Sequence, residues 1–156
     1  MSPQTVNAYY NPTQNEIVFP AGILQKPFFG HESMAENLGS IGVVIGHEMS
    51  HGFDDQGRKY NKKGELKEWW STKDCTEFSK RAKIVQKHYD TLKVYDSKIN
   101  GELTLGENIA DIGGLKLALR ALRLYYGKDK GEDQYNKFFH AYAKIWCMNI
   151  RKKNMQ

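Results

Sequence analysis

Two histidines and a glutamate lie close together in the stretch Val43–His51. His47 and His51 are four residues apart, so on an α-helix they share one face and their imidazoles can converge on one ion. At about 100° per residue, Glu48 projects roughly 60° beyond His51. There its carboxylate lies beside the ion and can take a proton from a bound water. Nitrogen ligands suit Zn²⁺, and the pattern is the H-E-x-x-H signature of metallopeptidases. It predicts one zinc ion per chain.

The same spacing also fits an amphipathic core helix with two hydrogen-bonded histidines. A match of five residues occurs by chance in unrelated proteins. Here, however, the motif follows the apolar run Val43-Val44-Ile45, which is the helical context that the signature needs.

A catalytic zinc site needs a third protein ligand, with water in the fourth position. The downstream spacing offers no third histidine. The best candidate is Glu107, which lies four residues before Asp111 and shares its helix face. A competing interpretation makes Glu107 part of a capping box with Thr104, and spacing alone leaves both open.

Two aspartates could orient the histidines. A carboxylate that accepts the free N–H of a ligand histidine fixes its tautomer and orientation. Asp111 could do this for one imidazole, and Asp54, three residues past His51, for the other.

The elements that must position these residues are mainly helices. Apolar periodicity predicts helices over about 33–53, 72–95 and 105–126. After a loop at 127–133, a last helix is expected to turn four residues inward: Phe138, Tyr142, Ile145 and Trp146. Two short strands, Val6–Tyr10 and Ile17–Phe19, predict a hairpin, and Pro12 between them places it at a sheet edge. Such an edge could bind an extended peptide, although a plain hairpin is equally consistent.

The helix that carries the histidines contains three glycines. Gly39, Gly42 and Gly46 each cost roughly 1 kcal/mol against alanine in a helix interior. We therefore expect another backbone to pack closely against this helix. Its core-facing stripe is predicted to comprise Met34, Leu38, Ile41, Val44 (or Ile45) and Met49.

Composition indicates an ordinary globular chain, long enough for one domain. The net charge of +5 is dispersed, apart from Lys59, Lys62 and Lys63 and the tail cluster at 151–153. Solvated faces are favoured over a nucleic-acid surface.

Cys75 and Cys147 are expected in helices, as buried thiols rather than a bridge. The chain opens without a signal sequence, and its longest apolar run is too short to span a bilayer. We therefore expect no membrane contact from this segment.

Five ordered stretches resemble the neprilysin family of zinc endopeptidases, which includes endothelin-converting enzymes and bacterial oligopeptidases. They are Val6–Tyr10, Ile17–Gln25, Val44–Asp55, Trp69-Trp70 and Leu105–Gly114. The resemblance implies that His47, His51 and Glu107 are zinc ligands and that Glu48 is the general base. It also implies that Asp111 orients a ligand histidine and serves as a proton donor.

The resemblance further implies that Asn7 and Ala8 hold the backbone of a peptide substrate. The implied fold is mainly α (α+β), similar to that of thermolysin, with a small edge β element.

The resemblance covers only part of the enzymes of this family. They carry a large helical region upstream, and a histidine and an arginine downstream that His31, His88 and His140 do not match. We therefore expect residues 1–156 to form a single, partial catalytic domain with weak or no peptidase activity. A non-catalytic, zinc-stabilised binding module is the alternative. The chain lacks the partner cysteines of animal relatives, which favours a bacterial type, cytoplasmic or exported; its oligomeric state is open.

Overall fold

The computed structural model describes residues 1–127 and 131–148, and these form a mainly helical fold with four short strands. This is the predicted fold class. The elements are β1 (Tyr9–Asn11), β2 (Glu16–Val18), α1 (Met34–Asn37), a π-helical turn (Leu38–Gly42), α2 (Val43–His51), α3 (Thr72–Asp90), β3 (Lys93–Val94), β4 (Ser97–Lys98), α4 (Leu105–Tyr126) and α5 (Glu132–Ile145). Two 3₁₀ turns lie at Ala21–Ile23 and Gly57–Lys59.

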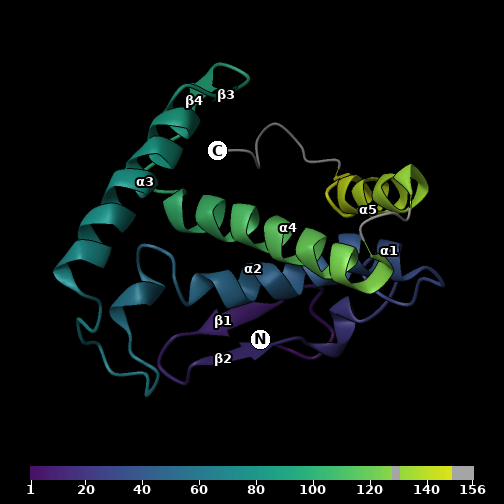
Figure 1. The fold of residues 1–156 in the computed structure, drawn as a ribbon, viewed down its shortest axis with the longest axis horizontal. Helices are drawn as coiled ribbons and strands as arrows, with labels where there is room; N and C mark the ends of the chain where they lie inside the picture. The colour runs from purple at the N-terminus through teal and green to yellow at the C-terminus, as the bar shows by residue number, and fades with distance from the viewer. Residues whose placement is uncertain (128–130, 149–156) are drawn as a thin grey trace.

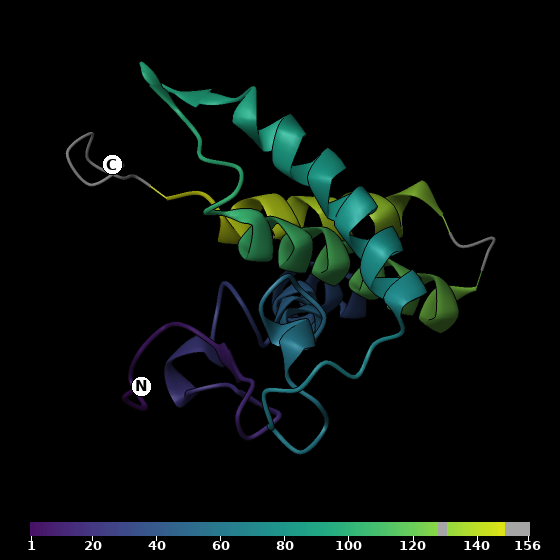
Figure 2. The ribbon, with the colours of Figure 1, turned by 90° about the vertical axis from the view of Figure 1, so that its left-hand side faces the viewer.

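Helix α2 lies at the centre of the fold. In Figure 1 it runs alongside α4 on one side and the β1–β2 hairpin on the other. Figure 2 shows α2 nearly end-on, with α4 on one side of it and the N-terminal segment on the other. Helix α5 packs against α1 at one end of the fold, whereas α3 leans away from the opposite end and carries the β3–β4 hairpin at its tip (Figure 1).

The N-terminal hairpin is antiparallel, with Tyr9 opposite Val18 and Tyr10 opposite Ile17. β1 is shorter than the predicted strand Val6–Tyr10, β2 is shifted by one residue from the predicted Ile17–Phe19, and Pro12 lies in the connecting turn. Ala8, just before β1, is buried in a cluster with Ile41 and Val44. This contact attaches the start of β1 to α2.

The predicted helix over 33–53 is observed from Met34 to His51, but it contains the π-helical turn. There the Ile41 N–H leaves the helix and donates to the Phe28 carbonyl at 2.9 Å. Met34 and Met49 are 39% and 50% exposed. Their predicted place in the core is therefore wrong. Met49 is five residues, or about 140°, from the buried Val44 and lies on the same helix face as Ile45, which is 38% exposed.

Close backbone packing is observed at two of the three helix glycines. A Cβ on Gly39 would overlap the carbonyl oxygen of Phe138 in α5, and one on Gly46 would lie 2.9 Å from the Gly114 backbone in α4. Gly42 faces only the Leu38 side chain and its own helix. The cost of Gly39 and Gly46 in a helix is thus offset by close contact with α5 and α4.

Helix α3 begins as predicted, where the Ser71 hydroxyl accepts a hydrogen bond from the Asp74 N–H at 3.1 Å. It ends at Asp90 rather than Tyr95, because the chain turns into the β3–β4 hairpin with Tyr95 at a positive φ of 53°. Ala82 is the only buried residue among those of α3.

The C-terminal helix buries Phe138 and Ile145, as predicted. Trp146 follows the end of α5 and is 45% exposed, so its predicted inward position is wrong. Cys75 lies half-buried in α3, and Cys147 lies exposed beyond α5; both are free. The absence of a bridge was expected. The predicted helical position is right for Cys75 but wrong for Cys147, because α5 ends at Ile145, and neither thiol is fully buried as predicted.

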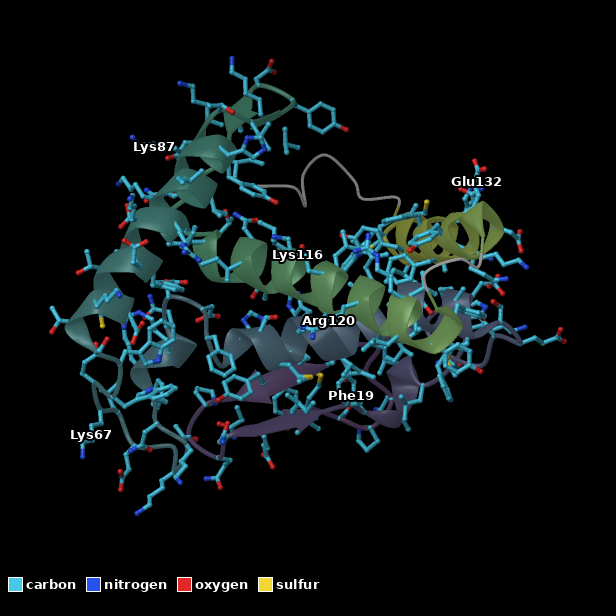
Figure 3. The ribbon with its side chains drawn as sticks, viewed as in Figure 1. Phe19, Lys67, Lys87, Lys116, Arg120 and Glu132 are labelled. Carbon is cyan, nitrogen blue, oxygen red and sulfur yellow. The ribbon has the colours of Figure 1, made fainter. Side chains whose placement is uncertain are left out.

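The basic side chains are dispersed over the described part of the molecule. Figure 3 shows Lys67, Lys87 and Lys116 on three separate elements. The predicted tail cluster at 151–153 and residues 128–130 of the predicted loop lie outside the described residues. Within residues 1–127 and 131–148, no helix is both long and apolar enough to cross a membrane.

Candidate metal centre

The centre is formed where α2 and α4 touch. A Cβ on Gly114 would come within 2.6 Å of the His47 backbone nitrogen and of the Val43 carbonyl oxygen, so the two helix backbones are in direct contact. Glu107 and Asp111 lie about two turns and one turn, respectively, before Gly114 on α4. Close contact at the glycines therefore brings both carboxylates to the face of α2 that carries the histidines.

Three potential ligand atoms converge there. The Nε2 atoms of His47 and His51 are 2.9 Å apart. An oxygen of Glu107, Oε2, lies 3.3 Å from the first and 3.6 Å from the second. Ligands about 2.05 Å from a tetrahedral zinc ion are separated by about 3.3 Å. The spacing of the three atoms thus fits one zinc ion, and their chemistry, two imidazoles and a carboxylate, fits as well.

The other ring nitrogens of the histidines point to carboxylates. His47 Nδ1 donates to Asp111 Oδ1 at 2.8 Å, and His51 Nδ1 donates to Asp54 Oδ2 at 2.7 Å. These bonds leave the Nε2 lone pairs directed at each other. Two facing lone pairs repel unless a cation, a proton or a metal, lies between them. The orientation of both rings therefore suits a cation at this point.

The metal-free histidines hold protons strongly. Burial lowers the pKa of His47, but its hydrogen bonds to Asp111 and Glu107 outweigh that effect and raise the pKa to about 9. For His51, burial is likewise outweighed by Asp54 and Glu107, and the pKa rises to about 10. The same two imidazoles hold the pKa of Glu107 well below its usual range. Protons thus occupy the position that a metal ion would take.

Glu48 is the second carboxylate near the histidines. His47, Glu48 and His51 have ligand atoms within 4.8 Å of one another, so the geometry offers two acidic candidates. The Glu107 oxygen approaches both Nε2 atoms, whereas Glu48 is 5% exposed and receives a hydrogen bond from the Tyr10 backbone. Burial raises the pKa of Glu48. The distances therefore favour Glu107 over Glu48 as the third potential ligand.

The competing capping box between Thr104 and Glu107 is not formed. The Thr104 side chain makes no capping hydrogen bond; its hydroxyl donates to the Asn100 carbonyl at 3.1 Å and accepts from Asn108 at 2.9 Å. Glu107 is consequently free to reach the histidines.

A cleft of about 380 Å³ opens over the centre. Its lining residues come from the start of β1, from α2 and the turn after it, and from α4: Asn7, Ala8, Tyr9, Tyr10, Pro12, His47, Glu48, His51, Asp54, Gln56, Gly57 and Glu107. Asn7 and Ala8 thus lie at the cleft, where the Asn7 side chain accepts the Ala8 N–H at 3.0 Å. The structure brings every predicted site residue to this region.

Sequence reasoning missed three residues of the centre, Tyr10, Gln56 and Gly57. All three act through backbone N–H groups, which no residue type reveals. The one available signal was Gly57, two residues after the Asp54-Asp55 pair, since a glycine in a tight turn permits close backbone approach.

The family of the chain follows from comparison with known proteins. The model of Peptidase family M13 matches residues 7–156. The chain belongs to Peptidase family M13. Human endothelin-converting enzyme 1 is 47% identical over 94% of the chain. Neprilysin-3 of Drosophila melanogaster is 44% identical over the same share.

Solved M13 structures share the fold. The zinc metalloprotease Zmp1 of Mycobacterium tuberculosis, in complex with an inhibitor, superposes with a TM-score of 0.89 at 46% identity over 94% of the chain. PepO from Lactobacillus rhamnosis gives 0.86 at 40% identity over the same share. The resemblance to zinc endopeptidases and the predicted fold class are thereby confirmed. Animal and bacterial relatives are similarly close, so the bacterial type stays a prediction.

The chain spans about a fifth of the curated relatives' length (20% in both cases) and about a quarter of the solved chains (24% and 23%). The comparisons thus place the chain in a peptidase family, as one part of a longer type of protein.

Proposed function

We propose that the chain contributes the zinc site of a metallopeptidase that hydrolyses peptide bonds in oligopeptides. His47, His51 and Glu107 would hold one Zn²⁺, and Asp111 and Asp54 would orient the two imidazoles. The observation that carries this proposal is the convergence of two Nε2 atoms and one carboxylate oxygen within 2.9–3.6 Å.

When bound, zinc would lower the pKa of a water toward about 7 and polarise the scissile carbonyl. Glu48 would take the proton of the attacking water and pass it to the leaving amine. Its burial raises its pKa, which brings a carboxylate closer to the neutral range where a general base works best. The Tyr10 N–H holds the Glu48 carboxylate, so the base is positioned by the hairpin as well as by α2.

The substrate proposed for this cleft is an extended peptide. Asn7 and Ala8 lie where the chain enters β1, beside the zinc ligands. A peptide placed there can pair its main chain with that of the protein, as in strand addition. Asp111 accepts the His47 Nδ1–H as a carboxylate, so it could serve as a proton donor only after taking up a proton, which its 41% exposed side chain would allow.

The isolated chain is proposed to be a partial catalytic domain that binds zinc but hydrolyses peptides slowly. Transition states of peptide hydrolysis need donors for the developing oxyanion, and losing one such donor typically costs about 10²–10³ in rate. Among the described residues that line the cleft, none is arginine or lysine, and the two histidines are the proposed ligands. The same observation favours the second candidate, a zinc-stabilised module without catalysis.

A Glu48→Gln variant tests the proposal. Zinc-loaded wild-type chain should cleave unstructured peptides slowly and lose this activity to a chelator. The variant should lose cleavage but retain one equivalent of zinc by elemental analysis, because Glu48 is not a ligand. Cleavage that survives in the variant or without metal would contradict the proposal. Stoichiometric zinc with no cleavage by the wild-type chain would select the second candidate.

A further inference from the structure

The two histidine–aspartate pairs at the metal centre are unequal. Asp54 is 6% exposed and uses both oxygens: Oδ2 accepts from His51, and Oδ1 accepts the backbone N–H groups of Gln56 at 2.8 Å and Gly57 at 2.6 Å. Asp111 is 41% exposed in its side chain, and among the described residues it makes a hydrogen bond only to His47.

We propose that Gly57, together with Gln56, is a positioning residue. Their backbone N–H groups decide which side-chain atom of residue 54 faces His51, and hence which ring nitrogen of His51 carries the proton. This inference rests on the zinc site proposed above. Two amide donors converge on one oxygen, so that oxygen must be an acceptor. The other oxygen is thereby directed at His51 Nδ1 and keeps the proton there, which leaves Nε2 free for a metal ion.

Gly57 suits this role because of its lack of a side chain. It is buried, and a Cβ at this position would overlap the His51 carbonyl oxygen. The backbone after α2 can therefore fold back against the last turn of the helix only with glycine here. On the other side, a Cβ on Gly106 of α4 would lie 3.2 Å from Asp54 Oδ2. The carboxylate of Asp54 is thus confined between the two glycines.

Asparagine substitutions make the difference measurable, because asparagine has the shape of aspartate but only one acceptor oxygen. In Asp54→Asn the Gln56 and Gly57 amides hold that oxygen, so the NH₂ group must face His51 Nδ1. Nδ1 then becomes an acceptor and the ring proton moves to Nε2, where it blocks metal binding. In Asp111→Asn no second partner fixes the amide, which can rotate and present its oxygen to His47.

The experiment compares zinc affinities, measured by competition with a chelating dye, in the wild-type chain and three variants. Asp54→Asn should bind zinc at least about 100-fold more weakly than wild type. The zinc affinity of Asp111→Asn should stay within about tenfold of the wild-type value. Loss of such a hydrogen-bond partner usually lowers metal affinity by about 10–100-fold. Asp55→Asn is the matched control, since it removes the same charge from the neighbouring residue without touching a histidine. Its zinc affinity should stay within about threefold of the wild-type value.

A second readout does not need metal. ¹⁵N NMR of the metal-free chains, recorded at a pH where the imidazoles are neutral, should show the His51 ring proton of Asp54→Asn on Nε2, while His47 in Asp111→Asn keeps its proton on Nδ1. Equal losses of zinc affinity in the two variants, or a His51 proton that stays on Nδ1, would overturn the inference. If the wild-type chain bound no zinc, the proposed site itself would fail instead, so the two failures are distinguishable.

Discussion

Helix α4 meets α2 and α3 in different ways. Toward α2 the backbones touch at Gly46 and Gly114. Toward α3 an apolar groove of about 700 Å³ remains, lined by residues such as Phe78, Val85 and Ile112.

The difference reflects what each contact must do. Side chains on two helices can bind one ion only if the helices are close enough to bring their ligand atoms to about 3 Å from each other. Glycine at the contact allows the helices to come that close. No predicted site residue lies on α3, and α3 buries a single residue, Ala82. Of these two contacts of α4, only the one that forms the metal centre is packed backbone to backbone.

The largest expected effect is at Gly114. Gly114→Ala places a methyl group 2.6 Å from backbone atoms of His47 and Val43, which cannot rotate away. The helices must separate, at a cost of about 1–3 kcal/mol, and zinc affinity should fall at least about 100-fold. Thermal unfolding and zinc competition measure the two effects.

Gly42→Ala is the matched control for Gly114→Ala. It lies in the helical segment that leads into α2 but faces the Leu38 side chain at 3.2 Å. Relative to glycine, alanine in a helix gains up to about 1 kcal/mol, so stability should hold or rise and zinc affinity should be unchanged. Similar losses in both variants would mean that close contact at Gly114 is not special.

A pH titration should separate the metal-free centre from the zinc-loaded one. The metal-free histidines have pKa values raised from 6.5 to about 9 and about 10. Their stabilising contribution is complete below pH 6.5 and is lost as pH rises through 9 to 10. Metal-free protein should therefore melt at lower temperature at pH 9.5 than at pH 6.5.

In zinc-loaded protein the melting temperature should instead rise with pH at the lower end of the titration. Bound histidines are deprotonated, so zinc competes better as pH rises and its stabilisation grows. Melting curves with a chelator and with excess zinc, from pH 6 to 10, test both. Parallel curves would show that the histidines do not exchange protons for metal.

The smallest effect is expected in the groove beside α3. Val85→Ala removes part of a half-buried side chain from an already open contact. It should cost under about 1 kcal/mol and leave zinc affinity within about twofold. A large loss of zinc affinity from this variant would show that α3 supports the metal centre after all.

The helices were predictable where local pattern decides them. Helix α4 has the predicted bounds, and Ser71 caps α3, because periodicity and capping are local properties. The π-turn at Leu38–Gly42 was not predictable: it depends on the Phe28 carbonyl, a partner remote in sequence. The exposure of Met49 follows from helix geometry, since Met49 shares a face with the half-exposed Ile45 rather than with the buried Val44.

The residues of the site, too, were predictable only where local spacing determines their arrangement. The spacing of His47 and His51 already indicates a shared ion, and the pairing of Glu107 with Asp111 indicates a common face. Spacing could not decide between a ligand and a helix cap for Glu107, since that choice depends on how closely α4 approaches α2. The amides of Tyr10, Gln56 and Gly57 remained hidden because every residue but proline offers one.

The central claim is that Glu107, and not Glu48, completes the zinc site. Zinc retained after dialysis of the metal-loaded chain, measured for wild type, Glu107→Gln and Glu48→Gln, tests it most directly. We predict one equivalent in wild type and Glu48→Gln, and well under half an equivalent in Glu107→Gln. Full retention in Glu107→Gln together with loss in Glu48→Gln would contradict the account.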